Sequence, residues 1–113
     1  MRNLKNSVQL LGHIGAKPEI KEFESGKKIA KFNLATNETF KNSNGEKVEN
    51  TDWHNIVVWD ARLINLTESY LDKGSQVLIE GKLTSRAWEN KEGNTSYTTE
   101  IIVNDILMLG SKK

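Results

Sequence analysis

The sequence has no cysteine among its 113 residues, which excludes a disulfide framework, a thiolate nucleophile and a cysteine-based zinc site. It has one proline, and only 7% of its residues are aromatic. No hydrophobic run approaches the roughly 18 residues of a membrane-spanning helix, and the N-terminus lacks the apolar core of a signal peptide. We therefore expect a soluble, cytoplasmic protein without a membrane partner.

Neither sign of charge is in excess, because 16 Lys and Arg residues stand against 15 Asp and Glu residues. This balance argues against a protein that packages polyanions through bulk charge, although a locally basic groove is still possible. The length suits one domain with a modest core. We predict a single domain over residues 1–110, followed by a short basic end at residues 111–113.

Short alternating stretches separated by turn residues predict an all-β protein. The expected strands cover residues 6–14, 28–37, 51–59, 75–88 and 95–103, with a short extended piece at 19–24 after Pro18. Residues 41–50 are expected to form a polar loop around Asn44-Gly45.

Near-helical spacing over residues 60–71 predicts one helix, with Asp60 as its N-cap and Gly74 at its end. Three strands, a helix and two strands follow the order of a five-stranded OB-fold Greek-key barrel, with one α-helix between strands 3 and 4. Other five-stranded barrels share this order.

The stretch TDWHNIVVWDARL holds two of the three tryptophans. Strand alternation places Trp53 and Trp59 on one side, about 20 Å apart. Asn55 lies between them and is a poor residue for a barrel interior. We therefore predict that Ile56 and Val58 face inward and that both indoles face outward.

The stretch KLTSRAW repeats this pattern, because Trp88 shares one face with Lys82 and Arg86. Charged side chains are rarely buried without a partner, so this face is expected to be solvated. The end of an earlier strand adds Phe40 beside Lys41. The pattern therefore predicts exposed aromatic rings beside basic residues.

Exposed rings beside basic residues suit single-stranded nucleic acid, because any base can stack on a ring and cations neutralise phosphates. A single exposed tryptophan could equally cover a core edge or a subunit interface. Three of them with shared basic neighbours favour a binding face.

The sequence also resembles the bacterial single-stranded DNA-binding protein family over residues 6–110. The resemblance rests on VQLLGHIGAKPEI, FNLATNETF, TDWHNIVVW, YLDKGSQVLIEGKL and YTTEIIV in this order and spacing. It implies a homotetrameric OB-fold protein that coats single-stranded DNA during replication, recombination and repair, in the cytoplasm at the nucleoid. Family members usually continue into a tail with an acidic tip that recruits other proteins. The printed sequence ends in LGSKK, so it gives no support for such recruitment.

The resemblance also implies roles for individual residues. The base-stacking positions are Phe40, Trp53, Trp59 and Trp88. The matched phosphate-contacting positions are Lys41, Arg62, Lys73 and Arg86, with Arg2 as a weaker candidate and Lys82 added from strand alternation. His54 matches a position associated with subunit contacts, and alternation points it away from Trp53.

No catalytic motif accompanies these residues. His13 and His54 lie in expected strands without carboxylates at metal-binding helical spacing. We therefore predict a binding protein that is not an enzyme and needs no metal or cofactor. An RNA-binding or primosomal OB-fold module is the alternative in the same class, and a divalent-metal nuclease is the alternative from another class.

Overall fold

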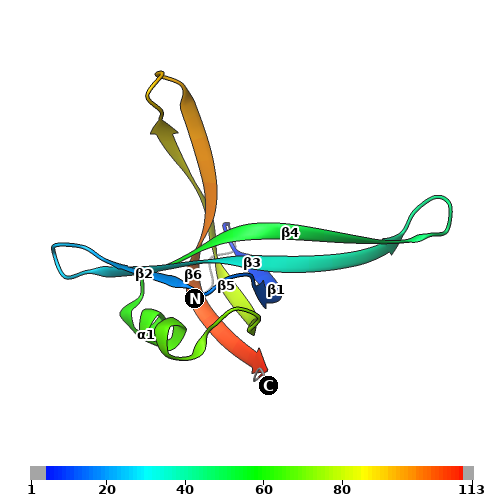
Figure 1. Cartoon of the computed structure of the whole chain (residues 1–113), viewed down its shortest axis with the longest axis horizontal. Helices are drawn as coiled ribbons and strands as arrows, with labels where there is room; N and C mark the ends of the chain where they lie inside the picture. The colour runs from blue at the N-terminus through cyan, green and yellow to red at the C-terminus, as the bar shows by residue number, and fades with distance from the viewer. Residues whose placement is uncertain (1–4, 111–113) are drawn as a thin grey trace.

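Seven elements make up the protein in the computed structural model, which describes residues 5–110. They are β1 (Val8–Ile14), β2 (Glu19–Glu22), β3 (Lys28–Lys41), β4 (Lys47–Val58), α1 (Ala61–Tyr70), β5 (Gln76–Glu89) and β6 (Thr95–Gly110). The strand order is β1-β5-β6-β4-β3-β2, and β1 also pairs with β3. This last pairing closes five strands into a barrel, which confirms the predicted fold, while β2 extends the edge of β3 (Figure 1).

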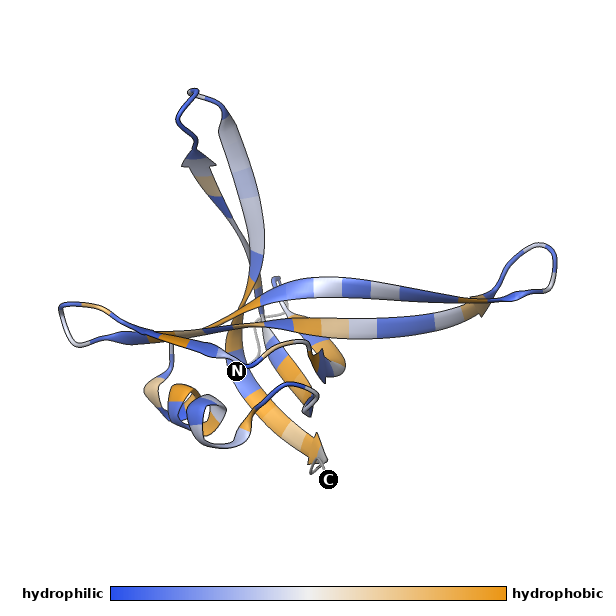
Figure 2. Ribbon diagram, viewed as in Figure 1, coloured by the Kyte–Doolittle hydropathy of each residue, from blue (hydrophilic) through white to orange (hydrophobic). Residues whose placement is uncertain are grey.

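The barrel core consists of alternating strand residues. Ile56 and Val58 are both fully buried, which confirms the inward direction predicted for them. Helix α1 contributes Leu63 and Ile64 to the same cluster. Figure 2 shows the apolar segments concentrated where the strands meet. The core therefore uses the inner face of the barrel and leaves most of the outer face available.

Helix α1 covers nearly the predicted span of residues 60–71, but the predicted role of Gly74 at its end was wrong. The Asp60 side chain caps the first turn by accepting a hydrogen bond from the Arg62 backbone N–H at 2.8 Å. The helix ends at Tyr70, with Leu71 as an extended C-cap. Gly74 adopts a positive φ of 90° in the turn that follows, so it shapes the approach to β5 and not the helix terminus.

The turn predicted around Asn44-Gly45 is present, but the predicted length of its loop, residues 41–50, was wrong. Strands β3 and β4 remain paired as far as Lys41 and Lys47, and only the short segment between them turns. The Asn42 carboxamide oxygen closes this turn by accepting hydrogen bonds from the backbone N–H groups of Asn44 and Glu46. The strand pattern is hidden in the sequence because both faces of this hairpin are solvated and carry polar residues.

Strand β6 also runs further than predicted, to Gly110 instead of residue 103. Its last residues, ILML, form a continuous apolar run without alternation. They pair with the first half of β5, and the register shifts between Glu80 and Gly81. The β3–β4 and β5–β6 hairpins project from the barrel as two long arms (Figure 1).

Barrel closure requires a glycine at position 12. A Cβ atom there would lie 3.0 Å from the Ala35 carbonyl carbon and closer still to its oxygen. We predict that Gly12→Ala lowers the free energy of unfolding by about 1–3 kcal/mol in urea denaturation, because the two strands would be forced apart. His13→Ala, at the exposed neighbouring side chain, should change it by less than about 0.5 kcal/mol. Equal stability of both variants and the wild type would contradict this account of closure.

Candidate nucleic-acid interface

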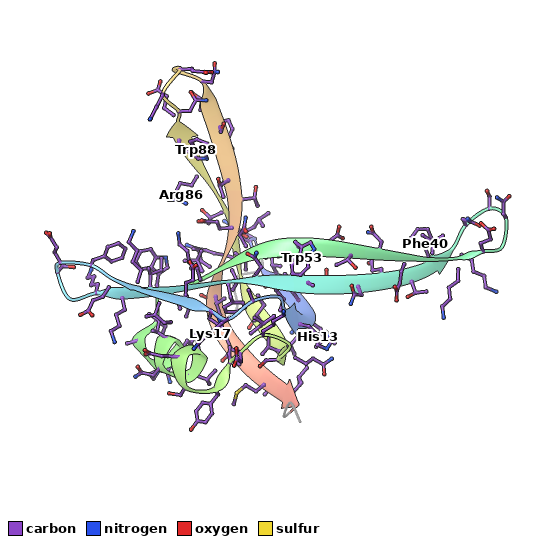
Figure 3. The ribbon with its side chains drawn as sticks, in the orientation of Figure 1. His13, Lys17, Phe40, Trp53, Arg86 and Trp88 are labelled. Atoms are coloured by element: carbon purple, nitrogen blue, oxygen red, sulfur yellow. The ribbon has the colours of Figure 1, made fainter. Side chains whose placement is uncertain are left out.

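Four large aromatic side chains predicted to be displayed are exposed. The exposed fractions are 51% for Phe40, 61% for Trp53, 49% for Trp59 and 48% for Trp88. Figure 3 shows Phe40 toward the tip of the β3–β4 arm, Trp53 near the barrel and Trp88 on the β5–β6 arm. The rings are therefore distributed along the molecule and do not form one cluster.

A hydrogen bond at the edge of its indole fixes Trp88 and leaves ring surface exposed to solvent. Its Nε1–H donates a hydrogen bond to Thr98 Oγ1 at 3.0 Å across the β5–β6 pair. This bond restricts rotation of the indole while using only its one polar group. A ring held in this way loses little conformational entropy when a planar group stacks on it.

Arg86 is tied to Glu100, a residue on the neighbouring strand β6. Arg86 Nη2 donates to Glu100 Oε2 at 3.0 Å, and Glu100 is largely buried while Arg86 is exposed. The buried carboxylate orients the guanidinium and offsets its charge. The remaining guanidinium donors can still form directional bonds to an anion.

Trp53 lies against the backbone at Gly15, just after β1. A Cβ atom at position 15 would lie 2.7 Å from Trp53 Cη2 and closer still to Cζ3. The ring therefore occupies space that any other residue at position 15 would fill. The sequence reasoning missed this contact because it joins two distant segments, and glycine before a Lys-Pro turn carries no distinct signal.

A polar groove of about 340 Å³ lies on the same outer surface. Its lining includes Lys17, Lys31, Asn33, Asn55, Thr98 and Glu100. Asn55 also donates from Nδ2 to the Thr99 carbonyl oxygen at 3.3 Å. The groove therefore includes Glu100, which pairs with Arg86, and Thr98, which accepts a hydrogen bond from Trp88. It also includes Asn55, two positions after Trp53. Lys17 was not among the predicted site residues.

Trp59 is placed by a different contact. Strand β4 ends at Val58, so strand alternation does not determine the direction of this ring. Trp59 stacks instead on Phe23, with ring centroids 6.3 Å apart and an interplanar angle of 14°. The expectation that one strand carries both Trp53 and Trp59 was therefore wrong, although both rings are exposed as predicted.

The predicted basic residues fall into two regions. Lys41, Lys82 and Arg86 are exposed; Lys41 follows Phe40 on β3, and Lys82 and Arg86 lie on β5, the strand that carries Trp88. Arg62 lies on α1, 3.7 Å from Asp60, and the exposed Lys73 lies in the turn after that helix. Helix α1 lies at the base of the molecule, away from the β5–β6 arm (Figure 1). Arg2 lies outside the described residues.

His54 is half-buried, and its Nε2 lies 3.0 Å from Thr36 Oγ1. This bond ties β4 to β3. Within residues 5–110, no group of three or more His, Asp or Glu side chains is arranged to hold a metal ion. No helix in that range has the length and apolarity to cross a membrane.

Comparison with known proteins agrees with the fold. The model of the Single-strand binding protein family matches residues 5–109. The chain is 48% identical to Single-stranded DNA-binding protein 1 of Chlorobaculum tepidum over 95% of its length, and 41% identical to the Single-stranded DNA-binding protein of Rhizobium meliloti over 87%. It spans 66% and 57% of the lengths of these two relatives.

A solved structure described as the Plasmodium falciparum SSB complex with ssDNA superposes with a TM-score of 0.88 and 37% identity. The match covers 97% of this chain and 98% of that one. The barrel is thus an OB-fold like that of this solved structure. More narrowly, the chain belongs to the single-strand binding protein family.

The Gly15 contact predicts a local effect on Trp53. Gly15→Ala should displace the indole and change the near-ultraviolet circular dichroism of the free protein, because the added methyl group needs the space of the ring. The same substitution in a Trp53→Phe background should give a much smaller spectral change. Ala16→Ser, at the exposed next position, is the control. Identical spectra for Gly15→Ala and the wild type would contradict the seating of Trp53 on Gly15.

Proposed function

We propose that this protein binds single-stranded DNA without sequence preference and protects it during replication, recombination and repair. Phe40, Trp53, Trp59 and Trp88 stack on bases in this proposal, and basic side chains contact phosphates. The observation that carries the proposal is that these rings are about half exposed or more and spread over two arms and the barrel. Membership of the family, and relatives named for single-stranded DNA binding, support it.

Stacking accounts for binding without sequence preference, because every base offers a π-face. Each stacked base contributes roughly 1–3 kcal/mol. The net formal charge of the whole sequence is only +1, so bulk attraction to a polyanion is small. Stacking is therefore the main source of affinity, and local cations guide the backbone between rings.

The phosphate contacts are proposed for Lys41, Lys82 and Arg86 on the arms, and for Arg62 and Lys73 near α1. Arg2 belongs to the same proposal. Glu100 offsets the charge of Arg86, so Arg86 acts more as an oriented hydrogen-bond donor than as a neutralising charge. The proposed activity is binding without turnover, needs no cofactor or metal, and takes place in the cytoplasm at the nucleoid.

Self-association is part of the proposal, with a homotetramer as the expected assembly. Leu11, Leu78 and Leu107 align in register across β1, β5 and β6, and Leu11 and Leu107 are exposed. A row of leucines on an outer sheet face is typical of a covered interface. One OB-fold binds only about 4–16 nucleotides, so assembly lengthens the bound path. His54 is proposed as a further subunit contact.

The stacking proposal predicts that Trp53→Ala and Trp88→Ala each weaken binding to a thymidine homopolymer by roughly 1–3 kcal/mol. Fluorescence anisotropy with a labelled strand measures this, and an equal-length duplex should bind much more weakly. Tyr70→Ala is the matched control, because Tyr70 is an exposed ring on α1 without a proposed role. Unchanged affinity in both tryptophan variants would contradict the assignment.

The leucine row predicts that Leu107→Glu lowers the molecular mass in sedimentation equilibrium, because a buried unpaired carboxylate would destabilise the interface. Tyr97→Glu, at an exposed position on the β5–β6 arm, should leave the assembly intact. An unchanged mass for Leu107→Glu would locate self-association elsewhere.

A further inference from the structure

The β2–β3 hairpin carries an exposed aromatic residue, Phe23, that the proposed binding path does not yet include. The backbone fixes its position: Phe23 N–H donates to the Lys27 carbonyl oxygen at 2.8 Å, and Gly26 N–H donates to the Phe23 carbonyl oxygen at 2.9 Å. Its ring stacks on Trp59 with an interplanar angle of 14°. Phe23 of the hairpin therefore covers one face of the Trp59 indole.

Core packing alone does not explain this ring pair. Phe23 is 38% exposed and Trp59 is 49% exposed, so the stack stands at the surface. Lys21 Nζ lies 5.5 Å from the centroid of Phe23, within range of a cation–π interaction. The pair therefore combines fixed aromatic surface with positive charge, as the rest of the proposed binding surface does.

Trp59 also lines a hollow of about 550 Å³ between the hairpin and helix α1. Lys27 and Lys28 border it from the hairpin, and Ala61, Ile64 and Asn65 border it from the helix. The hollow thus has an aromatic side, an apolar side and a basic side. Figure 1 shows the hairpin beside α1, at the opposite end of the molecule from the tip of the β3–β4 arm.

The local charge supports an anionic ligand with a flat apolar part. Residues 21–28 contain Lys21, Lys27 and Lys28 against Glu22 and Glu24. Of these charged residues, Lys27 and Lys28 line the hollow, and the glutamates do not. An aromatic base joined to a phosphate matches this arrangement.

We infer that the Trp59 hollow is a nucleotide subsite at one end of the binding path. One base of the bound strand stacks on Trp59 there, and Lys27 and Lys28 hold its phosphate. Phe23 acts as a positioning residue, because its ring fixes the indole against which the base stacks. This subsite rests on the proposed function and extends it to the β2–β3 hairpin.

The lysine contacts are tested by salt dependence. Lys27→Gln combined with Lys28→Gln should reduce the steepness of log affinity against log salt for a thymidine homopolymer by about 1.4, or about 0.7 per lost phosphate contact. Lys91→Gln, in the exposed turn of the β5–β6 arm, should leave the slope nearly unchanged. A double variant with the wild-type slope and affinity would overturn the subsite.

Phe23 is tested by a double-mutant cycle with Trp59. Phe23→Ala should weaken binding about 2- to 12-fold, the range of an aromatic pair, and should have little further effect in a Trp59→Ala background. Phe23→Leu keeps apolar volume without a ring face, so it should bind as weakly as Phe23→Ala. Wild-type affinity in Phe23→Leu would show that Phe23 only packs, and would overturn its positioning role.

The same titrations separate this subsite from the wider proposal. If the wild type binds, Trp88→Ala loses affinity and the hairpin variants lose none, the subsite is overturned and single-strand binding stands. Absence of wild-type binding overturns both. Thermal unfolding of each variant shows whether a weakened complex comes from a weakened fold.

Discussion

The pairing of β1 with β3 is the constraint on which the rest of the structure depends. It joins Ile14 to Leu34 and His13 to Ala35, and thereby turns an open sheet into a barrel with an enclosed core. Glycine at position 12 permits the close approach, and glycine three residues later makes room for Trp53. One short segment therefore both closes the barrel and seats a central ring of the proposed interface.

Barrel closure also determines which residues the outer surface can carry. Since the inward strand residues and helix α1 form the core, most of the outer surface of the two hairpins needs no apolar cover. The hairpins can extend beyond the barrel as polar arms that display Phe40 and Trp88 (Figures 2 and 3). Contacts to Thr98, Gly15 and Phe23 then hold the three indoles in place. The proposed surface is preorganised, which reduces the entropy lost on binding.

Features governed by local pattern could be predicted from the sequence. Strand alternation identified the buried Ile56 and Val58 and the exposed Trp53 and Trp88, and residue spacing identified the Asp60 cap. The β3–β4 arm was missed because polar residues on both faces of a solvated hairpin leave no alternation, whereas the strands of the β5–β6 arm were predicted. The last part of β6 was missed because Asn104 and Asp105 interrupt the strand pattern and residues 106–109 are apolar without alternation.

Contacts between distant segments could not be predicted in the same way. The stacking of Phe23 on Trp59, the seat of Trp53 on Gly15 and the Arg86–Glu100 ion pair each join separate elements. No local pattern marks the two partners of such a contact. Those contacts decide how each ring is held, so the sequence could indicate the residue types of the site but not its geometry.

The central claim is that stacking on displayed rings, more than bulk charge, drives binding of a single strand. Titration of the unmodified protein with a thymidine homopolymer at several salt concentrations tests it most directly, with tryptophan fluorescence as the signal. The account predicts strong quenching at saturation, and an affinity that falls with salt but extrapolates to a substantial value at about 1 M salt, where phosphate contacts contribute little. Binding without quenching, or an affinity that extrapolates to almost none at about 1 M salt, would contradict it.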